Sequence, residues 1–402
     1  MPEFLKVLNY QTARQLLKDH FPPRGIEDLP LAQCNNRVLA QAMISPENIP
    51  AFNRSTVDGY AVRAEDTFGS SESLPGMLDY SAEVQMGKEP EFTIANGHCA
   101  WIPTGGMLPP GSNAVVMVEY TERLGKDTIL AFRPVAPGEN VMQRGEDIGS
   151  GQLIFPSGKL LKAQEIGLLA SLGIERVPVF KPYHIGILST GDEIVPLEQV
   201  PAIGQVRDVN SYALSAALES CGAVAHGYPL VEDDRLVLQR GVEKALQEND
   251  VLIMSGGSSV GVADYSVQVM LSLPEAEMLF HGIAVKPGKP TIGVRVGHKL
   301  IIGLPGHPVS ALMVFYILCA PLISAAVPRL LDAKIVVNVA SQSGRDDFVP
   351  VKLIRDEDGW KAQPLLGKSG LMSILAQADG YVHIAYEKQG IKAGDSVQVT
   401  IF

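Results

Sequence analysis

Between residues 179 and 328, short apolar runs of the kind found in buried strands alternate with segments of helical periodicity. The apolar runs cover residues 184–188, 251–254 and 300–304, and the helical patterns cover residues 211–220, 235–247 and 309–327. Such alternation favours a parallel sheet with helices on both faces. We therefore expect a doubly wound α/β domain over residues 178–328.

The flanking segments follow other patterns. Residues 51–137 hold short β-type runs between Gly/Pro turns, which predicts a small, mostly β domain. Residues 329–402 return to β alternation, with strands expected at 335–339, 349–354, 381–385 and 396–401 and a hairpin turn at Asp358-Gly359, which predicts a C-terminal β-barrel. Residues 23–50 and 138–177, with helical pieces at 35–43 and 163–172, form an expected extended connecting domain, and a helix within residues 1–22 is expected to pack with residues 178–328.

Composition excludes several classes of protein. The formal net charge of -11 argues against a broad nucleic-acid surface. The four cysteines lie far apart, which is unlike a disulfide framework or a structural zinc site and fits reduced thiols in the cytoplasm. The N-terminus lacks the pattern of a secretory signal.

One apolar stretch, residues 309–327, is long enough to span a bilayer. It contains Ser310, Pro321 and Ser324, and it begins directly after a tight turn at residues 305–308. We therefore expect a helix packed in a protein core, and no membrane association.

Three expected strands run into Gly-rich turns, at residues 187–193, 253–261 and 303–308. Ligands of open α/β sheets bind at the carboxyl ends of the strands, and free N–H groups at helix starts favour anions. Neither a Walker A loop nor a G-x-G-x-x-G fingerprint is present in the sequence. The alternative is that the glycines only ease strand-to-helix turns. The candidate substrate-binding residues are Gly256, Gly257, Ser258, Ser259, Gly261, Pro305, Gly306 and Pro308.

A short basic loop contains Lys286 and Lys289, and it is stiffened by Pro287 and Pro290. Two ammonium groups on such a loop can hold an oxyanion as point charges. A solvated surface loop is the alternative.

Several carboxylates stand beside glycine or in tight turns. Such residues often accept only local N–H bonds. If they converge, they supply the hard oxygen ligands that Mg²⁺ prefers, and a cation would let a carboxylate-lined site accept a phosphate-bearing substrate. The candidate metal ligands are Asp147, Glu193, Asp208 and Asp264, and Asp58 belongs to the same group of turn carboxylates.

Eight motifs in this order resemble the MoeA family, whose eukaryotic relatives include the C-terminal domain of gephyrin. The resemblance covers essentially the whole chain. The motifs are NRSTVDGYA (53–61), PTGG (103–106), GEDI (145–148), STGDE (189–193), SGGSSVG (255–261), KPGKP (286–290), PGHPVS (305–310) and GLMS (370–373).

The resemblance implies a homodimer of four-domain subunits whose active clefts combine parts of both chains. It implies that adenylylated molybdopterin and molybdate give molybdenum cofactor and AMP, with Mg²⁺ or a similar divalent ion. By similarity, molybdate is held by Lys286, Lys289, Ser310, Arg345 and Ser373, and the catalytic polar residues around the pterin phosphates, nucleotide and metal are Asp58, Thr104, Glu193, Asp208 and Asp264, with Asp147 beside them. Further partners implied are the molybdopterin adenylyltransferase and apo-molybdoenzymes.

Some positions depart from the family pattern: Met142, Arg207, Val209, Val267 and His307. They bear on the pterin site more than on the reaction class. Two alternatives remain open, a molybdopterin adenylyltransferase and a non-catalytic scaffold or cofactor carrier on the same fold.

Overall fold

The computed structural model describes residues 7–232, 234–256 and 265–402. It contains two compact units: an α/β–barrel unit, built from the described residues of 1–28, 36–38 and 178–402, and a small-sheet unit, residues 29–35 and 39–177. The chain passes between them within β1 (Ile26–Pro30), on either side of residues 36–38, and within β12 (Arg176–Phe180). The finer domain boundaries stay a prediction.

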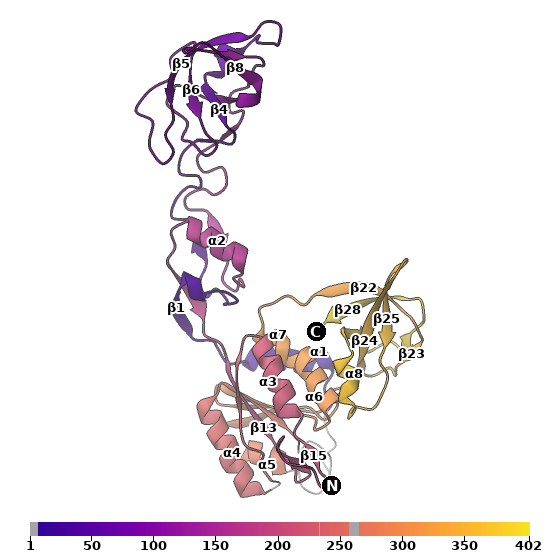
Figure 1. Cartoon of the computed structure of the whole chain (residues 1–402). Coiled ribbons are helices and arrows are strands. Elements are labelled where there is room, and N and C mark those ends of the chain that lie inside the picture. Colours follow the sequence, from indigo (N-terminus) through magenta and orange to yellow (C-terminus); the bar gives the residue numbers. More distant parts are fainter. Residues whose placement is uncertain (1–6, 233, 257–264) are drawn as a thin grey trace. The chain divides into compact units, whose positions relative to one another are not determined.

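The α/β part of the first unit is a six-stranded sheet of order β16-β13-β17-β21-β20-β18 (Figure 1). Its first four strands are parallel, which confirms the doubly wound prediction. Strand β20, which pairs antiparallel with both β21 and the edge strand β18, and β18 itself were not predicted from the sequence. The strands are β13 (His184–Ser189), β16 (Val224–Gly227), β17 (Val251–Ser255), β18 (Ala276–His281), β20 (Ile292–Val296) and β21 (Lys299–Leu304).

Alternate side chains of the central strands enter two different cores. Ile185, Ile253 and Ile302 pack with α1 (Tyr10–His20), α3 (Asn210–Ser220) and α6 (Pro308–Val314). Leu252 and Ile301 point to the other face and pack with α4 (Arg235–Glu248) and α5 (Tyr265–Ser272). Because a strand shows its side chains to both faces in turn, a sheet buried on both faces needs nearly continuous apolar runs.

The apolar stretch 309–327 is a buried core segment, as predicted, but not one continuous α-helix. It divides into α6, a π-helical turn η4 (Phe315–Cys319) and α7 (Ala320–Ile323). The last turn ends before Ser324, whose backbone is extended. In the described part of the chain, no helix is both long and apolar enough to cross a membrane.

The C-terminal segment forms the predicted barrel. Strands β24, β25, β22, β28 and β26 close a ring through the β24–β26 pairing, and β19 (Val285–Lys286) adds to β24 from outside. The barrel strands are β22 (Leu330–Ile335), β24 (Asp346–Asp356), β25 (Gly359–Pro364), β26 (Gly380–Ile384) and β28 (Ser396–Ile401); the accessory elements are β23 (Val339–Ala340), β27 (Gly390–Ile391) and α8 (Met372–Ala376). The predicted turn at Asp358-Gly359 joins β24 to β25, with Gly359 at φ 116°. The strand expected at 335–339 was wrong, because Ile335 ends β22 and the side chain of Asn338 accepts a turn hydrogen bond from Ala393 N–H.

The small-sheet unit is mostly β, as predicted, with a six-stranded sheet of order β7-β4-β6-β5-β9-β8. These strands are β4 (Gly59–Val62), β5 (Gly76–Glu83), β6 (His98–Ile102), β7 (Ala114–Met117), β8 (Thr121–Leu124) and β9 (Thr128–Ala131); smaller elements are β2 (Met43–Ile44), β3 (Arg54–Ser55), β10 (Val141–Met142), β11 (Leu153–Phe155), α2 (Ala163–Ser171) and the 3₁₀ turns η1 (Leu31–Gln33), η2 (Ala64–Thr67) and η3 (Val118–Tyr120).

The helix expected at 35–43 was wrong. Asn36 has φ 60°, a left-handed conformation that interrupts a right-handed helix, and Leu39 exchanges backbone hydrogen bonds with Gly158 and Lys159.

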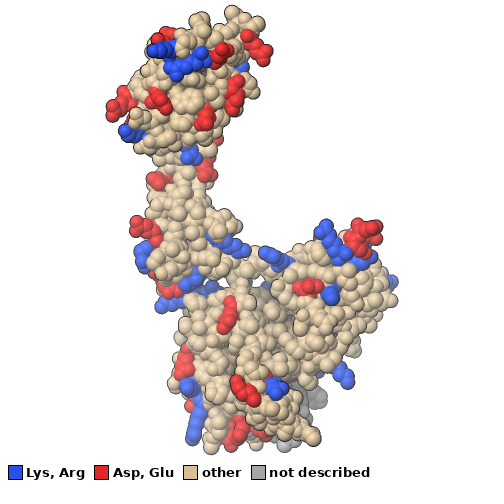
Figure 2. Space-filling view, in the orientation of Figure 1, with Lys and Arg blue, Asp and Glu red and all other residues tan. Residues whose placement is uncertain are grey.

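Figure 2 shows acidic and basic side chains interspersed over the visible face, separated by uncharged surface. The visible face of the described residues therefore carries no broad basic surface of the kind that nucleic acids require.

Candidate functional site

The turns after three parallel strands meet at one edge of the sheet, as the sequence predicted. Strand ends Ser189, Ser255 and Leu304 are in register. Gly256 has φ 102°, and a Cβ there would lie 2.0 Å from the carbonyl oxygen of Thr190. Only glycine fits so close an approach of two backbones.

Asn210 ties two of these turns together. Its side-chain amide donates to Ser255 Oγ at 2.5 Å and to the carbonyl oxygen of Gly306 at 2.8 Å. A Cβ on Gly306 would in turn lie 3.7 Å from Gly256 Cα. Asn210 was not among the predicted site residues, because a buried amide at a helix start carries no motif by itself.

The two predicted carboxylates at this edge differ in their surroundings. Asp208 is buried, and its Oδ1 accepts the Ser211 N–H at 3.1 Å at the start of α3. Glu193 is exposed, and its carboxylate lies over the turn glycine, with Oε2 2.8 Å from where a Cβ of Gly191 would be. Asp208 therefore stabilises a helix start, whereas Glu193 is open to a ligand.

The other predicted residues of the second turn, Gly257, Ser258, Ser259 and Gly261, and the predicted carboxylate Asp264 lie outside the described residues. Among the residues that the structure does describe, no three His, Cys, Asp or Glu side chains gather in a way that suits a metal ion. The described side chains therefore do not form a magnesium site by themselves.

The basic loop is fixed to both the barrel and the α/β core. Lys286, in β19, stands in parallel register with Asp347 of β24. Gly288 has φ 110°, and a Cβ there would lie 2.1 Å from Val314 Cγ2 in α6. Thr291 Oγ1 donates to the Gly288 carbonyl oxygen at 2.6 Å. The loop is thus held by packing and hydrogen bonding, unlike a solvated surface loop.

A pocket of about 1170 Å³ opens between this loop, the turn after β21 and the barrel. Its lining brings together four predicted molybdate residues, Lys286, Lys289, Ser310 and Arg345, and the predicted Pro305. It also contains three residues for which no role there was predicted, His307, Asp347 and Ser369. Gly306 and Pro308 belong to the same turn but do not line the pocket.

Ser373 does not line this pocket. It lies in the first turn of α8 and is exposed, whereas Ser369, four residues earlier, is part of the lining. Ser369, which lines the pocket, directly precedes the GLMS motif, whereas Ser373 within the motif does not line it.

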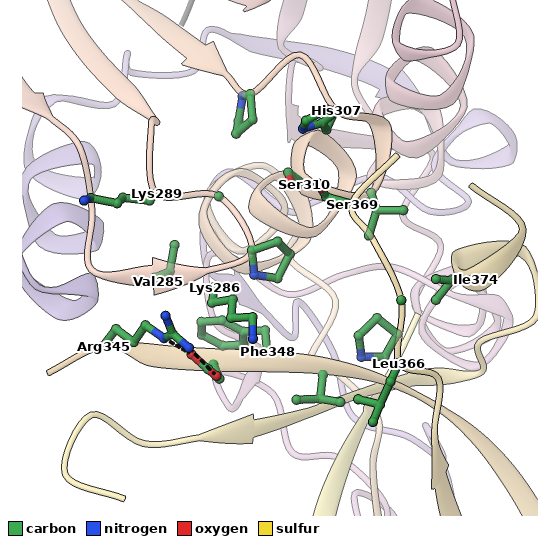
Figure 3. A pocket seen from close by; sticks show the side chains of 18 of the residues that line it. Val285, Lys286, Lys289, His307, Ser310, Arg345, Phe348, Leu366, Ser369 and Ile374 are labelled. Carbon is green, nitrogen blue, oxygen red and sulfur yellow. Dashed lines mark hydrogen bonds and ion pairs between the residues drawn. The ribbon is translucent and has the colours of Figure 1, made fainter. Parts of the chain in front are cut away.

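The basic side chains come from strand β19 (Lys286), from the loop that follows it (Lys289) and from the bend just before β24 (Arg345). In Figure 3 the Lys286 ammonium and the Arg345 guanidinium point toward the same region, while Lys289 extends from the loop in another direction. Arg345 Nε donates to Asp347 Oδ1 at 2.8 Å. Within the described part of the chain, neither lysine ammonium has an ion-pair partner. An unpaired ammonium beside a guanidinium favours a small anion.

Asp58 and Thr104 belong to the small-sheet unit. Asp58 Oδ1 accepts the Thr104 N–H at 2.6 Å and the Thr104 hydroxyl at 2.8 Å. These two donors, the backbone one first, hold the pKa of the Asp58 carboxyl below its ordinary value. Among the described residues, hydrogen bonds to the Asp58 carboxylate reach only Oδ1. Asp147 is exposed in the same unit.

Three of the five positions that depart from the family pattern make local contacts. Met142 Sδ accepts a hydrogen bond from Arg54 at 3.4 Å, Arg207 Nε donates to the Leu197 carbonyl oxygen at 3.0 Å, and Val267 packs against the α4–α5 core. Val209 is exposed before α3, and His307 lines the pocket.

Comparison with known families covers most of the chain. Residues 8–173 match the MoeA N-terminal region (domain I and II), residues 186–325 match a "probable molybdopterin binding domain", and residues 332–402 match the MoeA C-terminal region (domain IV).

Individual relatives agree with these matches. The chain is 31% identical over 407 residues to a molybdopterin molybdenumtransferase of Haemophilus influenzae, covering 98% of this chain and 99% of that protein. It is 35% identical over 300 residues to one of Nostoc, covering 74% and 68%. Among solved structures, it is similar to a molybdopterin biosynthesis MoeA protein from Pyrococcus horikoshii, with a TM-score of 0.86, 31% identity, and coverage of 99% and 100%.

Proposed function

Because the chain belongs to the MoeA family, we propose that it is a molybdopterin molybdenumtransferase, which inserts molybdenum from molybdate into adenylylated molybdopterin and releases AMP. The observation that carries the proposal is the pocket in which Lys286 and Arg345 point to one region beside Ser310. A tetrahedral dianion is bound best by ammonium, guanidinium and hydroxyl donors with no unpaired carboxylate between them.

The pocket has room for more than the oxyanion. Its volume of about 1170 Å³ exceeds that of a typical pocket for a drug-sized ligand. We propose that Lys286, Arg345 and Ser310 bind molybdate, that the flexible side chain of Lys289 turns to join them, and that the dithiolene end of the pterin enters beside them. The sulfurs of the substrate then capture the metal, so the protein supplies no covalent nucleophile. Positioning and electrostatics carry the catalysis.

We propose that polar residues outside this pocket bind the phosphate-bearing part of the substrate. The exposed Glu193 lies at the carboxyl edge of the sheet, where ligands of such folds bind. Asp58 is a carboxylate with a free oxygen, and we propose that it acts with Thr104 on the pterin phosphates or nucleotide. The catalytic set remains Asp58, Thr104, Glu193, Asp208 and Asp264, and the active clefts of a homodimer combine residues of both chains.

The proposed reaction requires Mg²⁺ because the substrate contains a phosphoanhydride. A phosphoanhydride develops negative charge at the breaking P–O bond, which a divalent cation offsets. Because the described carboxylates form no complete site, we propose that Mg²⁺ enters with the phosphates and that Asp147, Glu193, Asp208 and Asp264 are its candidate ligands.

The cellular setting follows from the same reaction. We propose a cytoplasmic protein that receives adenylylated molybdopterin from an adenylyltransferase and supplies the cofactor to apo-molybdoenzymes. Nucleic acids and membranes are not expected partners.

The test is reconstitution. Purified protein is given adenylylated molybdopterin, molybdate and Mg²⁺, and AMP release and activation of an apo-molybdoenzyme are measured. We expect both to require molybdate. Rapid adenylylation of molybdopterin by ATP without molybdate would identify an adenylyltransferase instead, and binding of the pterin with neither reaction would identify a carrier.

A further inference from the structure

Arg345 and Asp347 form a forked ion pair in the wall of the pocket. Arg345 Nε donates to Asp347 Oδ1 at 2.8 Å, and Nη2 donates to Oδ2 at 3.4 Å, as the dashed lines in Figure 3 show. Two nitrogens on two oxygens fix the plane of a guanidinium as well as its position. A lysine could not be held in this way.

The two partners differ in exposure. The Asp347 side chain is 4% exposed, whereas that of Arg345 is 32% exposed. A buried carboxylate needs a cationic partner, so Asp347 is committed to Arg345. Arg345 has five N–H donors, of which the fork uses two. The remaining three are available to a ligand in the pocket.

Strand alternation separates Asp347 from the neighbouring carboxylate. Asp346 also is buried, but it accepts from His383 Nε2 at 2.6 Å and does not line the pocket. Asp347 lines the pocket and is in parallel register with Lys286. The fork therefore places the Arg345 guanidinium on the same side of the paired strands as the Lys286 ammonium.

We infer that Asp347 is a positioning residue for oxyanion binding: it does not touch the anion, and it holds the Arg345 guanidinium in the plane in which its free N–H donors meet the anion opposite Lys286. This inference rests on the proposed function of the pocket. It goes beyond that function because it gives the Asp347 carboxylate, a negative charge in the wall of an anion site, the role of positioning Arg345.

The test is a double-mutant cycle on the full-length enzyme. In the reconstituted reaction, Asp347→Asn is expected to raise the KM for molybdate about tenfold, with the KM for adenylylated molybdopterin unchanged. In an Arg345→Gln background the same substitution is expected to change the molybdate KM less than twofold, because coupled residues lose their effect when the partner is gone. Asp346→Asn is the matched control, a neighbouring buried carboxylate whose loss should leave the molybdate KM unchanged.

Arg345→Lys covers the case in which Asp347→Asn does not fold. It keeps the charge and leaves Asp347 in place but removes the fork, and it should raise the molybdate KM to a similar extent. An Asp347→Asn effect that persists in the Arg345→Gln background, or an Arg345→Lys enzyme with the wild-type KM, would overturn the inference. If Lys286→Ala also leaves the molybdate KM unchanged, the proposed function of the pocket fails and the inference fails with it.

Discussion

Asp58 receives two hydrogen bonds from the single residue Thr104, and both end on the same carboxylate oxygen, Oδ1. Within the part of the chain that the structure describes, no hydrogen bond reaches Oδ2. The two residues are 46 positions apart in the sequence, at the start of β4 and in the turn after β6. The small sheet therefore prepares an oriented carboxylate that remains ionised at neutral pH.

Removal of the Thr104 hydroxyl tests whether that hydroxyl helps to keep the Asp58 carboxylate ionised. Thr104→Val should raise the pKa of Asp58 part of the way toward its ordinary value of 3.8, because the stronger influence, the backbone N–H, remains. A folded-state pKa below the ordinary value means that the associated stability is complete at neutral pH and is lost only as the pH falls through the lowered pKa. A ¹³C titration of selectively labelled aspartate measures it. Thr104→Ser keeps the hydroxyl and should titrate like the wild type; equal pKa values in all three proteins would refute the role of the hydroxyl.

Removal of the basic groups tests the anion site. Lys286→Ala should raise the KM for molybdate roughly 10- to 150-fold, the usual cost of losing a hydrogen bond to a charged group. Lys289→Ala should also raise it but by less, because its side chain extends away from Lys286. Steady-state AMP release at varied molybdate measures both. Lys244→Ala, an exposed lysine of α4, removes the same charge outside the pocket and should have no effect. Unchanged molybdate dependence in the Lys286 and Lys289 variants would remove the pocket from the mechanism.

Gly288 tests the rigidity of the basic loop. Gly288→Ala places a Cβ 2.1 Å from Val314 Cγ2 at a φ of 110°, so the loop must shift and carry its lysines with it. We expect a raised molybdate KM together with a lowered melting temperature. Gly204→Ala is the control, since Gly204 has φ 92° with open space around it and so carries the strain, about 1–2 kcal/mol, without the clash. A Gly288→Ala enzyme that matches Gly204→Ala in both measurements would show that the packing of the loop is unimportant.

The buried Tyr10 is expected to make the stability of the protein depend on pH in the alkaline range. Burial, the largest influence, raises its pKa to about 12, and its hydroxyl donates to the Ile317 carbonyl oxygen at 3.0 Å. A raised folded-state pKa means that the stability is complete below pH 10 and is lost as the pH rises through about 12. Hydrogen exchange in α1 should therefore accelerate over this range. In Tyr10→Phe the part of this acceleration due to Tyr10 should disappear, at a cost of roughly 1–3 kcal/mol at neutral pH. Tyr120→Phe, at an exposed tyrosine, should retain the wild-type profile.

The α/β sheet was predictable because its physical signal is local. A strand buried on both faces must be nearly continuous in apolar residues, and Ile185, Ile253 and Ile301 belong to such runs. Strands β18 and β20, which pair antiparallel, were not predicted from the sequence, because Glu277 and Arg295 interrupt the apolar pattern on this partly exposed side of the sheet. The prediction for residues 309–327 was correct in that the segment is buried and wrong in that it is not one regular helix. A π-turn has no periodic pattern in the sequence from which it could be predicted.

The residues that line the pocket were predictable in part as residue types and not as a geometry. The stiff basic loop led to Lys286 and Lys289, and resemblance to the family led to Ser310 and Arg345. The choice between Asp346 and Asp347, or between Ser369 and Ser373, depends on which side of a strand or helix faces the pocket. For the two aspartates, that orientation is set by the pairing of β19 with β24, a contact between distant parts of the chain that local sequence does not encode.

The most direct measurement is an X-ray anomalous difference map of crystals soaked with tungstate, a heavier tetrahedral dianion of the same charge as molybdate. We predict one strong peak in the pocket, within hydrogen-bonding distance of Lys286, Arg345 and Ser310, and its loss in Lys286→Ala crystals. A strong peak elsewhere, with none in this pocket, would contradict the assignment of the oxyanion site.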